Sequence, residues 1–296
     1  VRSRQHTKNK NKGASSPESN VGDPSLAPDL TPQADETSYT TTKTPPHMKI
    51  QLTATNMTDN TTKGFPMETT KESNVTRIAC INPNGLQLDR TSGKLPLIIT
   101  TMKEYDMDVL GLPETRVNTS HPFANQLCRE SSHDLTSAKM TITSTSPYVQ
   151  TQPLSQAGGV GMISAGPIAS RRLSDYCDPI GRWTSQTFSG SEGIKYTIIT
   201  CYQTCQKKEE PGKVTAANLQ SAYLRKHGYM NPEPRQQFWH DLKKYLTILK
   251  NDQQEVLVIG DFNECLYSTG SGMAQILRKY QLYDITYHAY PDIDFA

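Results

Sequence analysis

The sequence predicts an α/β fold whose neighbouring strands run parallel and end at one edge of a sheet. Two features carry this prediction. Apolar runs of strand length, such as 107–112 and 256–259, end abruptly in polar residues. Between the runs 77–81 and 107–112, apolar residues recur at helical spacing. A strand, a helix and a further strand in succession are typical of parallel neighbours.

The first strand is expected at 77–81, and the polar turn 82–85 follows it. The next apolar residues fall on one face of a helix, which begins near a proline suited to its first turn: Leu95, Ile98, Ile99, Met102 and Tyr105. The second strand, 107–112, ends in the polar cluster 113–116. Because parallel strands deliver their carboxyl ends to one edge, Asn82 and Glu114 are expected to meet.

The middle of the chain predicts further strands with one short helix. A helix is expected over 123–129 and a strand over 139–145. The glycine-rich run 158–163 lacks the Lys-Ser/Thr of a phosphate loop, so we interpret it as a strand that packs closely against another backbone. Residues 182–188 and 194–202 predict a hairpin with a glycine-containing turn.

The last third predicts three helices and one strand. Helices are expected over 213–226, 235–250 and 272–280, the second with an apolar stripe for core packing. Residues 256–259 are β-branched or leucine without alternation, which predicts a strand that is buried on both faces. Gly260 then allows a tight turn, so the residues after it emerge at the carboxyl end of the strand.

Residues 1–75 are expected to be a disordered leader, and 76–296 the folded domain. The chain has 296 residues with an apolar fraction of 34%, which is low for a wholly folded protein. Thr, Ser, Pro, Asn and Lys dominate the first 75 residues, with no sustained apolar period. Such a leader should be dispensable for folding of the domain.

The net charge and the cysteine content do not identify a binding partner. The net charge of +2 is too small to identify a nucleic-acid binder. The six cysteines form no paired CxxC motif, so we interpret them as reduced core residues. No run is long enough for a membrane span and no signal-peptide core is present, which predicts a soluble intracellular protein. The basic opening of the chain is compatible with a nuclear address.

Polar side chains follow four of the expected strands: Asn82, Glu114, Tyr202 and the pair Asp261 and Asn263. Any one of them could be a turn residue, and a plain Asx turn would explain Asp261 and Asn263 by itself. Their recurrence at the same structural position favours a site. Hard oxygen donors of this kind suit Mg²⁺.

Four pieces of the chain resemble motifs of the endonuclease/exonuclease/phosphatase superfamily: 81–86, 112–116, 158–162 and 260–263. The resemblance extends over about 77–296. It implies a four-layer sandwich of two mixed β-sheets flanked by helices, with the site where the sheets open. It also implies that the domain is incomplete at its C-terminus.

The resemblance implies a role for each candidate residue. Glu114 would be the principal ligand of Mg²⁺, or of Mn²⁺ in its place, and Asn82 a second ligand. Asp261 would orient or deprotonate the attacking water. Asn263 would donate a hydrogen bond to the scissile phosphate, and Tyr202 would contact a phosphate oxygen.

This sequence departs from the family pattern at three places. Asn84 stands where nucleases of the family often carry Asp, and Cys205 stands where an asparagine is usual. The closing Ser-Asp-His motif has no counterpart, because 132–134 has the wrong order and place and His288 lacks an adjoining acid. The chain is therefore expected to be nearly inactive as it stands.

Within the family, the amino-acid sequence of 260–264 and the Thr/Ser/Pro-rich leader resemble the endonuclease domain of LINE-type retrotransposons. This resemblance implies Mg²⁺-dependent hydrolysis of DNA. A phosphomonoesterase would share the same residues. A decayed copy that at most binds nucleic acid is the non-enzymatic alternative, although such a copy need not keep Glu114 and Asp261.

Overall fold

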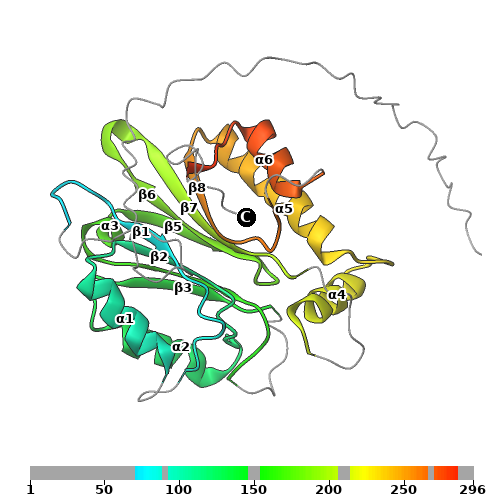
Figure 1. Ribbon diagram of the computed structural model, residues 1–296, viewed down its shortest axis with the longest axis horizontal. Coiled ribbons are helices and arrows are strands. Elements are labelled where there is room, and N and C mark those ends of the chain that lie inside the picture. The colour runs from blue at the N-terminus through cyan, green and yellow to red at the C-terminus, as the bar shows by residue number, and fades with distance from the viewer. Residues whose placement is uncertain (1–70, 89–92, 146–153, 206–213, 266–269, 286–296) are drawn as a thin grey trace, which may run out of the picture. The chain divides into compact units, whose positions relative to one another are not determined.

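The computed structural model describes residues 71–88, 93–145, 154–205, 214–265 and 270–285, which form two mixed four-stranded sheets flanked by helices (Figure 1). This architecture confirms the fold class predicted from the sequence. In this part of the chain, no helix is both long and apolar enough to cross a membrane.

The first sheet has the order β1-β2-β4-β3. Its strands are β1 (Ile78–Cys80), β2 (Val109–Pro113), β3 (Lys139–Thr143) and β4 (Val160–Ser164). β1 and β2 are parallel, as the strand–helix–strand order predicted, and the other pairs are antiparallel. Cys80 is opposite Gly111 in the register, so the loops after these two strands leave the sheet side by side.

The second sheet has the order β5-β6-β7-β8. Its strands are β5 (Arg172–Cys177), β6 (Trp183–Ser189), β7 (Lys195–Tyr202) and β8 (Glu255–Asp261). β6 and β7 form the predicted hairpin, closed by the 3-10 turn η1 (Ser191–Gly193). β7 and β8 are parallel, and Tyr202 lies opposite Asp261.

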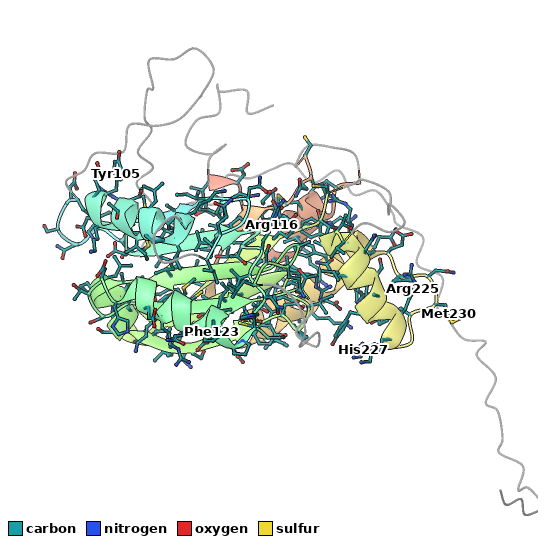
Figure 2. All side chains as sticks on the ribbon, turned by 90° about the horizontal axis from the view of Figure 1, so that it is seen from below. Tyr105, Arg116, Phe123, Arg225, His227 and Met230 are labelled. Carbon is teal, nitrogen blue, oxygen red and sulfur yellow. The ribbon has the colours of Figure 1, made fainter. Side chains whose placement is uncertain are left out.

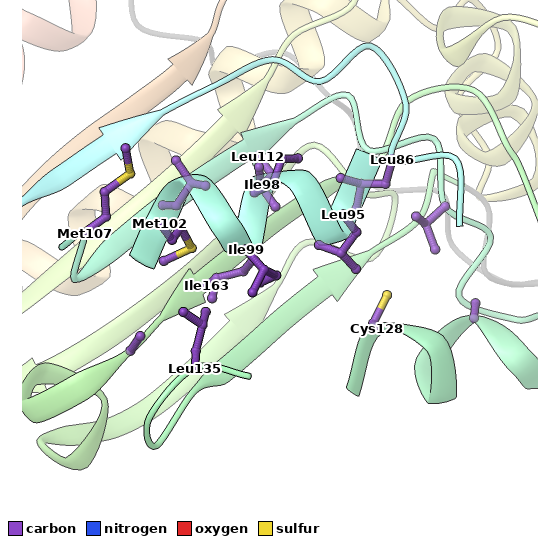
Figure 3. Packing of buried hydrophobic residues seen from close by; sticks show 14 residues of the cluster. Leu86, Leu95, Ile98, Ile99, Met102, Met107, Leu112, Cys128, Leu135 and Ile163 are labelled. Atoms are coloured by element: carbon purple, nitrogen blue, oxygen red, sulfur yellow. The ribbon is translucent and has the colours of Figure 1, made fainter. Parts of the chain in front are cut away.

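Six helices complete the described part of the chain: α1 (Lys94–Glu104), α2 (Pro122–Ser132), α3 (Gly166–Ser170), α4 (Ala216–Lys226), α5 (Pro234–Asn251) and α6 (Gly272–Tyr280). The apolar face that was predicted for α1 is buried against the first sheet (Figure 3). α4 begins later than expected, because Thr215 caps it by accepting a hydrogen bond from the Asn218 backbone N–H. α3 and β5 were not predicted.

Three apolar layers separate these elements. One lies between α1, α2 and the first sheet, and another between the second sheet and helices α5 and α6. The apolar stripe predicted for 235–250 belongs to the latter layer and also includes Trp239. The third layer joins the two sheets through Val109, Met162, Ile168, Phe188 and Ile198. The sheets are therefore fixed against each other by side chains from both.

The prediction that 256–259 is buried on both faces is confirmed for the packing of the two faces, but the strand is less buried than expected. β8 is at the edge of its sheet among the described strands, and every apolar residue in it is half-buried. Its faces are nevertheless both apolar, because Val256 and Val258 pack towards α5 and α6 while Leu257 and Ile259 pack between the sheets. The apolar pattern of β8 indicates that both of its faces are covered, but it does not indicate the place of the strand within the sheet.

The prediction that the cysteines are core residues is wrong for half of them. None of the six forms a disulfide, but Cys80, Cys205 and Cys265 are exposed. Cys80 ends an edge strand, and the other two lie in the loops that follow β7 and β8. A small apolar side chain next to a strand end is therefore not necessarily part of the core.

The predicted leader, 1–75, lies outside the described residues except for 71–75. Within that short stretch, Lys71 Nζ lies 2.8 Å from Asp108 Oδ1, and both side chains are largely buried. The backbone N–H of Arg77 donates to the other oxygen of the same carboxylate at 2.6 Å. The domain therefore extends at least to Lys71.

Deleting 1–70 should leave the unfolding transition almost unchanged, whereas Lys71→Met should lower the free energy of unfolding by about 1–3 kcal/mol. Methionine keeps the apolar stem but removes the charge that neutralises the Asp108 carboxylate. Urea denaturation followed by fluorescence measures both effects. Lys103→Met is the matched control, because its ion pair with Asp134 is exposed and should contribute little. Equal losses for the two lysines would contradict the prediction.

Candidate active site

The ends of β1, β2 and β8 bring three of the predicted residues together. The Asn82 Nδ2 group donates to Glu114 Oε2 at 3.2 Å and to Asp261 Oδ2 at 2.8 Å. Asn82 and Glu114 therefore meet as the parallel pairing predicted. One amide thus joins a carboxylate from each sheet.

The two sheets approach closely next to this cluster because of Gly111. A Cβ atom at Gly111 would lie 2.7 Å from Thr200 Oγ1 and 2.8 Å from Ile259 Cδ1. No other residue would allow β2 to lie so close to β7 and β8 without a shift of these side chains. The glycine therefore lets the ends of the two sheets share one site.

The Glu114 loop has a backbone conformation that non-glycine residues rarely adopt. Glu114 has a φ of 55° and Arg116 a φ of 52°. The strain is held by hydrogen bonds from the N–H of Thr115 to Gly159 O (3.1 Å) and of Arg116 to Gly158 O (2.8 Å). Left-handed residues held in this way are common at functional sites. The glycine-rich run thus supports the loop that carries Glu114.

The interpretation of 158–163 as a closely packed strand is confirmed for 160–163, whereas the two glycines pack closely outside the strand. β4 begins at Val160, and the two glycines before it have φ values of 81° and 80°. A Cβ at Gly158 would lie 2.3 Å from Thr145 Oγ1, and one at Gly159 would lie 2.8 Å from Thr143 O. Both the backbone conformation and the space require glycine at these two positions.

Each oxygen of the Glu114 carboxylate has a donor. Arg116 donates to Oε1 from Nε at 3.0 Å and from a terminal NH2 at 2.7 Å, while Asn82 donates to Oε2. The Glu114 side chain is 16% exposed, and the Arg116 side chain is 44% exposed. The arginine was not predicted as a site residue.

Asp261 uses one carboxylate oxygen to close a turn and the other to contact the site. Its Oδ1 accepts from the Asn263 backbone N–H at 3.1 Å, which is the Asx turn considered from the sequence. Its Oδ2 accepts from Asn82. Gly260 before it has a φ of 146°, and a Cβ there would lie 2.1 Å from Cys201 O. The turn therefore aims the second oxygen into the site.

Asn263 is held at both ends of its amide. Its Nδ2 donates to Gln203 O at 2.8 Å, and its Oδ1 accepts from Cys205 Sγ at 3.3 Å. Because the amide nitrogen carries two hydrogens, one N–H remains for a ligand. Cys205, one of the departures from the family pattern, thus orients the neighbouring asparagine.

Tyr202 is 5% exposed and lines a cavity of about 790 Å³ together with Glu114 and Arg116. Burial raises the pKa of its phenol, and the nearby charges of Glu114, Cys205 and Asp261 raise it further. The phenol therefore stays protonated at neutral pH. It can donate a hydrogen bond to an anion.

Residues that the sequence analysis did not name brace the loops after β7 and β8. Arg235 donates to the backbone oxygen of Thr204 and, at 3.1 Å, to that of Asn263. Glu264 accepts from the Trp239 indole N–H at 2.9 Å. Glu264 directly follows the Asp261 motif, and this position in the sequence could have indicated that it belongs to the same loop.

The donor set fits a hard divalent cation. It holds two carboxylates, and Mg²⁺ usually binds one or two carboxylates while keeping several waters. Asn82 turns Nδ2 towards both carboxylates, and its Oδ1 accepts from the Asn84 N–H at 2.8 Å. Direct ligation by Asn82 would therefore require its amide to rotate. Across the described ranges, no three His, Cys, Asp or Glu residues cluster as a metal site.

One of the two histidines considered for the Ser-Asp-His motif lies away from the site. His133 caps the C-terminal end of α2, on the outer layer of the molecule. The segment 132–134 therefore has no part in the site. His288 lies outside the described residues.

The sequence model of the Endonuclease/Exonuclease/phosphatase family matches residues 88–289, which is more than half of the chain. The chain therefore belongs to this family. Its members include hydrolases of phosphate esters, in keeping with the family's name. No curated protein matches the chain.

Several solved structures are similar in fold. The human Nocturnin catalytic domain with bound sulfate is 15% identical, with a TM-score of 0.40 over 70% of this chain and 69% of that chain. An AP endonuclease from Archaeoglobus fulgidus is 14% identical, with a TM-score of 0.42 over 74% and 76%. A Bacteroides thetaiotaomicron mannosyl-6-phosphatase is 10% identical, with a TM-score of 0.40 over 69% and 71%. At these values, family membership rests on the family match alone.

Replacing Gly159 by alanine should destabilise the protein more than replacing Gly193 by alanine. The two glycines have similar φ values, 80° and 76°, but a Cβ meets Thr143 O only at Gly159 and has open space at Gly193. Gly193→Ala should cost about 1–2 kcal/mol from the backbone conformation alone. Urea denaturation of both variants measures the additional cost of the clash, and equal losses would refute it.

Tyr202 should ionise above the usual tyrosine pKa of about 10. The difference between the alkaline absorbance titrations of the wild type and Tyr202→Phe, read at 295 nm, isolates this phenol. Because its pKa is raised in the folded state, its contribution to stability is intact below pH ~10 and is lost as the pH rises through the folded-state value. A midpoint at or below pH ~10 would contradict the assignment.

Proposed function

We propose that this protein hydrolyses phosphodiester bonds of DNA with Mg²⁺, or with Mn²⁺ in its place, as an endonuclease of the LINE type. The observation that carries the proposal is the pairing of Glu114 and Asp261 through the Asn82 amide. Two carboxylates from separate sheets form a site with local negative charge. Membership of the Endonuclease/Exonuclease/phosphatase family supports a phosphate ester as the substrate.

Glu114 would hold the metal, with Asn82 as a second ligand after rotation of its amide. When bound, the metal would lower the pKa of water and stabilise the charge that develops on the phosphate. Rotation of the Asn82 amide would also release Asp261 Oδ2, which would then accept a proton from the attacking water while Oδ1 stays engaged in the turn.

Two neutral donors would bind the phosphate. The Tyr202 phenol keeps its proton, so it donates to a phosphate oxygen without adding negative charge. Asn263 is fixed by Gln203 and Cys205 and would donate its remaining amide N–H. Donors that are fixed before the substrate arrives stabilise the transition state without reorganisation.

DNA is proposed as the partner because the amino-acid sequence of 260–264 and the composition of the leader resemble those of LINE-type endonucleases. A nuclear location is proposed from the basic opening of the chain. A phosphomonoesterase would use the same five residues, so the assay must separate diesters from monoesters.

Glu114→Gln should reduce Mg²⁺-dependent nicking of supercoiled plasmid by roughly a hundredfold or more, because it removes the principal ligand. Asp261→Asn should have an effect of similar size. Glu104→Gln is the matched control, since Glu104 is an exposed residue at the end of α1.

The same proteins are assayed on bis(p-nitrophenyl) phosphate and p-nitrophenyl phosphate. Hydrolysis of the monoester alone would identify a phosphomonoesterase. Nicking by the wild type that Glu114→Gln leaves at full rate would remove Glu114 from the site. No hydrolysis of any substrate by the wild type, with Mg²⁺ or Mn²⁺, would favour a non-catalytic chain.

A further inference from the structure

Arg116 donates twice to one oxygen of the Glu114 carboxylate. Its Nε and NH2 groups both donate to Oε1, at 3.0 and 2.7 Å, in a fork that engages this one oxygen. The other oxygen is engaged by Asn82. Rotation of the Asn82 amide would leave Oε2 open to a metal, but that metal would then share the carboxylate with the positive charge of Arg116.

The Arg116 backbone is fixed, whereas its side chain is partly exposed. The backbone N–H donates to Gly158 O, and the backbone oxygen accepts from the Gln156 N–H, both at 2.8 Å. The stem packs over Gly85, where a Cβ would lie 3.1 Å from Arg116 Cδ. The side chain is 44% exposed, so its guanidinium can turn without being buried or stripped of water.

Space is available on both sides of this side chain. Arg116 lines the cavity of about 790 Å³ that also contains Tyr202, and a second cavity of about 170 Å³ next to Asn84. In the view of Figure 2, Arg116 lies between the part of the molecule marked by Tyr105 and helix α4, marked by Arg225. Because the side chain is partly exposed, the guanidinium lies at the surface rather than inside the core.

We propose that Arg116 is the counter-ion of Glu114 in the metal-free protein and turns to a phosphate group of the nucleic acid when a metal binds. This inference rests on the proposed function. Two cations close to one carboxylate repel each other, so the metal releases the guanidinium. The planar fork that grips a carboxylate also matches the geometry of a phosphate.

The first test is a titration of the full chain with Mn²⁺ in the absence of nucleic acid. Arg116→Gln keeps the stem up to Cδ but removes the competing charge, so it should bind Mn²⁺ roughly two- to fivefold more tightly than the wild type. Arg116→Lys should remain near the wild type. Arg129→Gln removes an exposed charge from α2 and should leave the affinity unchanged.

The second test measures binding of a labelled 20-base-pair DNA duplex, with EDTA and then with Ca²⁺. With EDTA, the wild type and Arg116→Gln should bind equally, because Arg116 is held by Glu114. With Ca²⁺, the wild type should bind more tightly, and its logarithmic salt dependence should be steeper by about one phosphate contact. Equal melting temperatures show that each variant is folded.

Three results would contradict the proposed role of Arg116 or the proposed metal site. An equal loss of DNA affinity with EDTA and with Ca²⁺ would mean that Arg116 always faces DNA, and the proposed switch would be wrong. Unchanged Mn²⁺ affinity in Arg116→Gln would also overturn it. If neither the wild type nor Arg116→Gln bound Mn²⁺, the proposed metal site at Glu114 would fail instead, which separates the two proposals.

Discussion

The Asn82 amide bridges two carboxylates that lie far apart in the chain and come from different sheets. Glu114 follows a strand of the first sheet, and Asp261 ends a strand of the second. The bridge exists because β1 is parallel to β2, β7 is parallel to β8, and Gly111 allows the sheets to approach. The position of every other candidate residue follows from this arrangement of strand ends.

Much of the fold could be predicted because its elements have simple apolar periods. The stripe on α1, the hairpin of β6 and β7 and the meeting of Asn82 with Glu114 follow from periodicity and from the rule for parallel strands. The edge position of β8 among the described strands could not be predicted, because apolar faces and strand pairing are separate properties. β5 was missed because it is polar and mostly exposed, so it has no apolar period.

The candidate site was less accessible from the sequence. The positions of Glu114 and Asp261 were predicted, since each follows an apolar strand, but their partners depend on backbone conformation. Arg116 reaches Glu114 across two residues because both have positive φ values, and nothing in their residue types requires this conformation. The roles of Asn263 and Tyr202 in binding phosphate stay predictions.

The turn and the catalytic interpretations of Asp261 do not exclude each other. One oxygen closes the Asx turn with Asn263, and the turn fixes the direction of the other oxygen towards Asn82. The same logic applies to Glu114, whose strained loop is held by Gly158 and Gly159. In both cases a local backbone motif aims a carboxylate, so the residues that shape the loops are as necessary to the site as its charges.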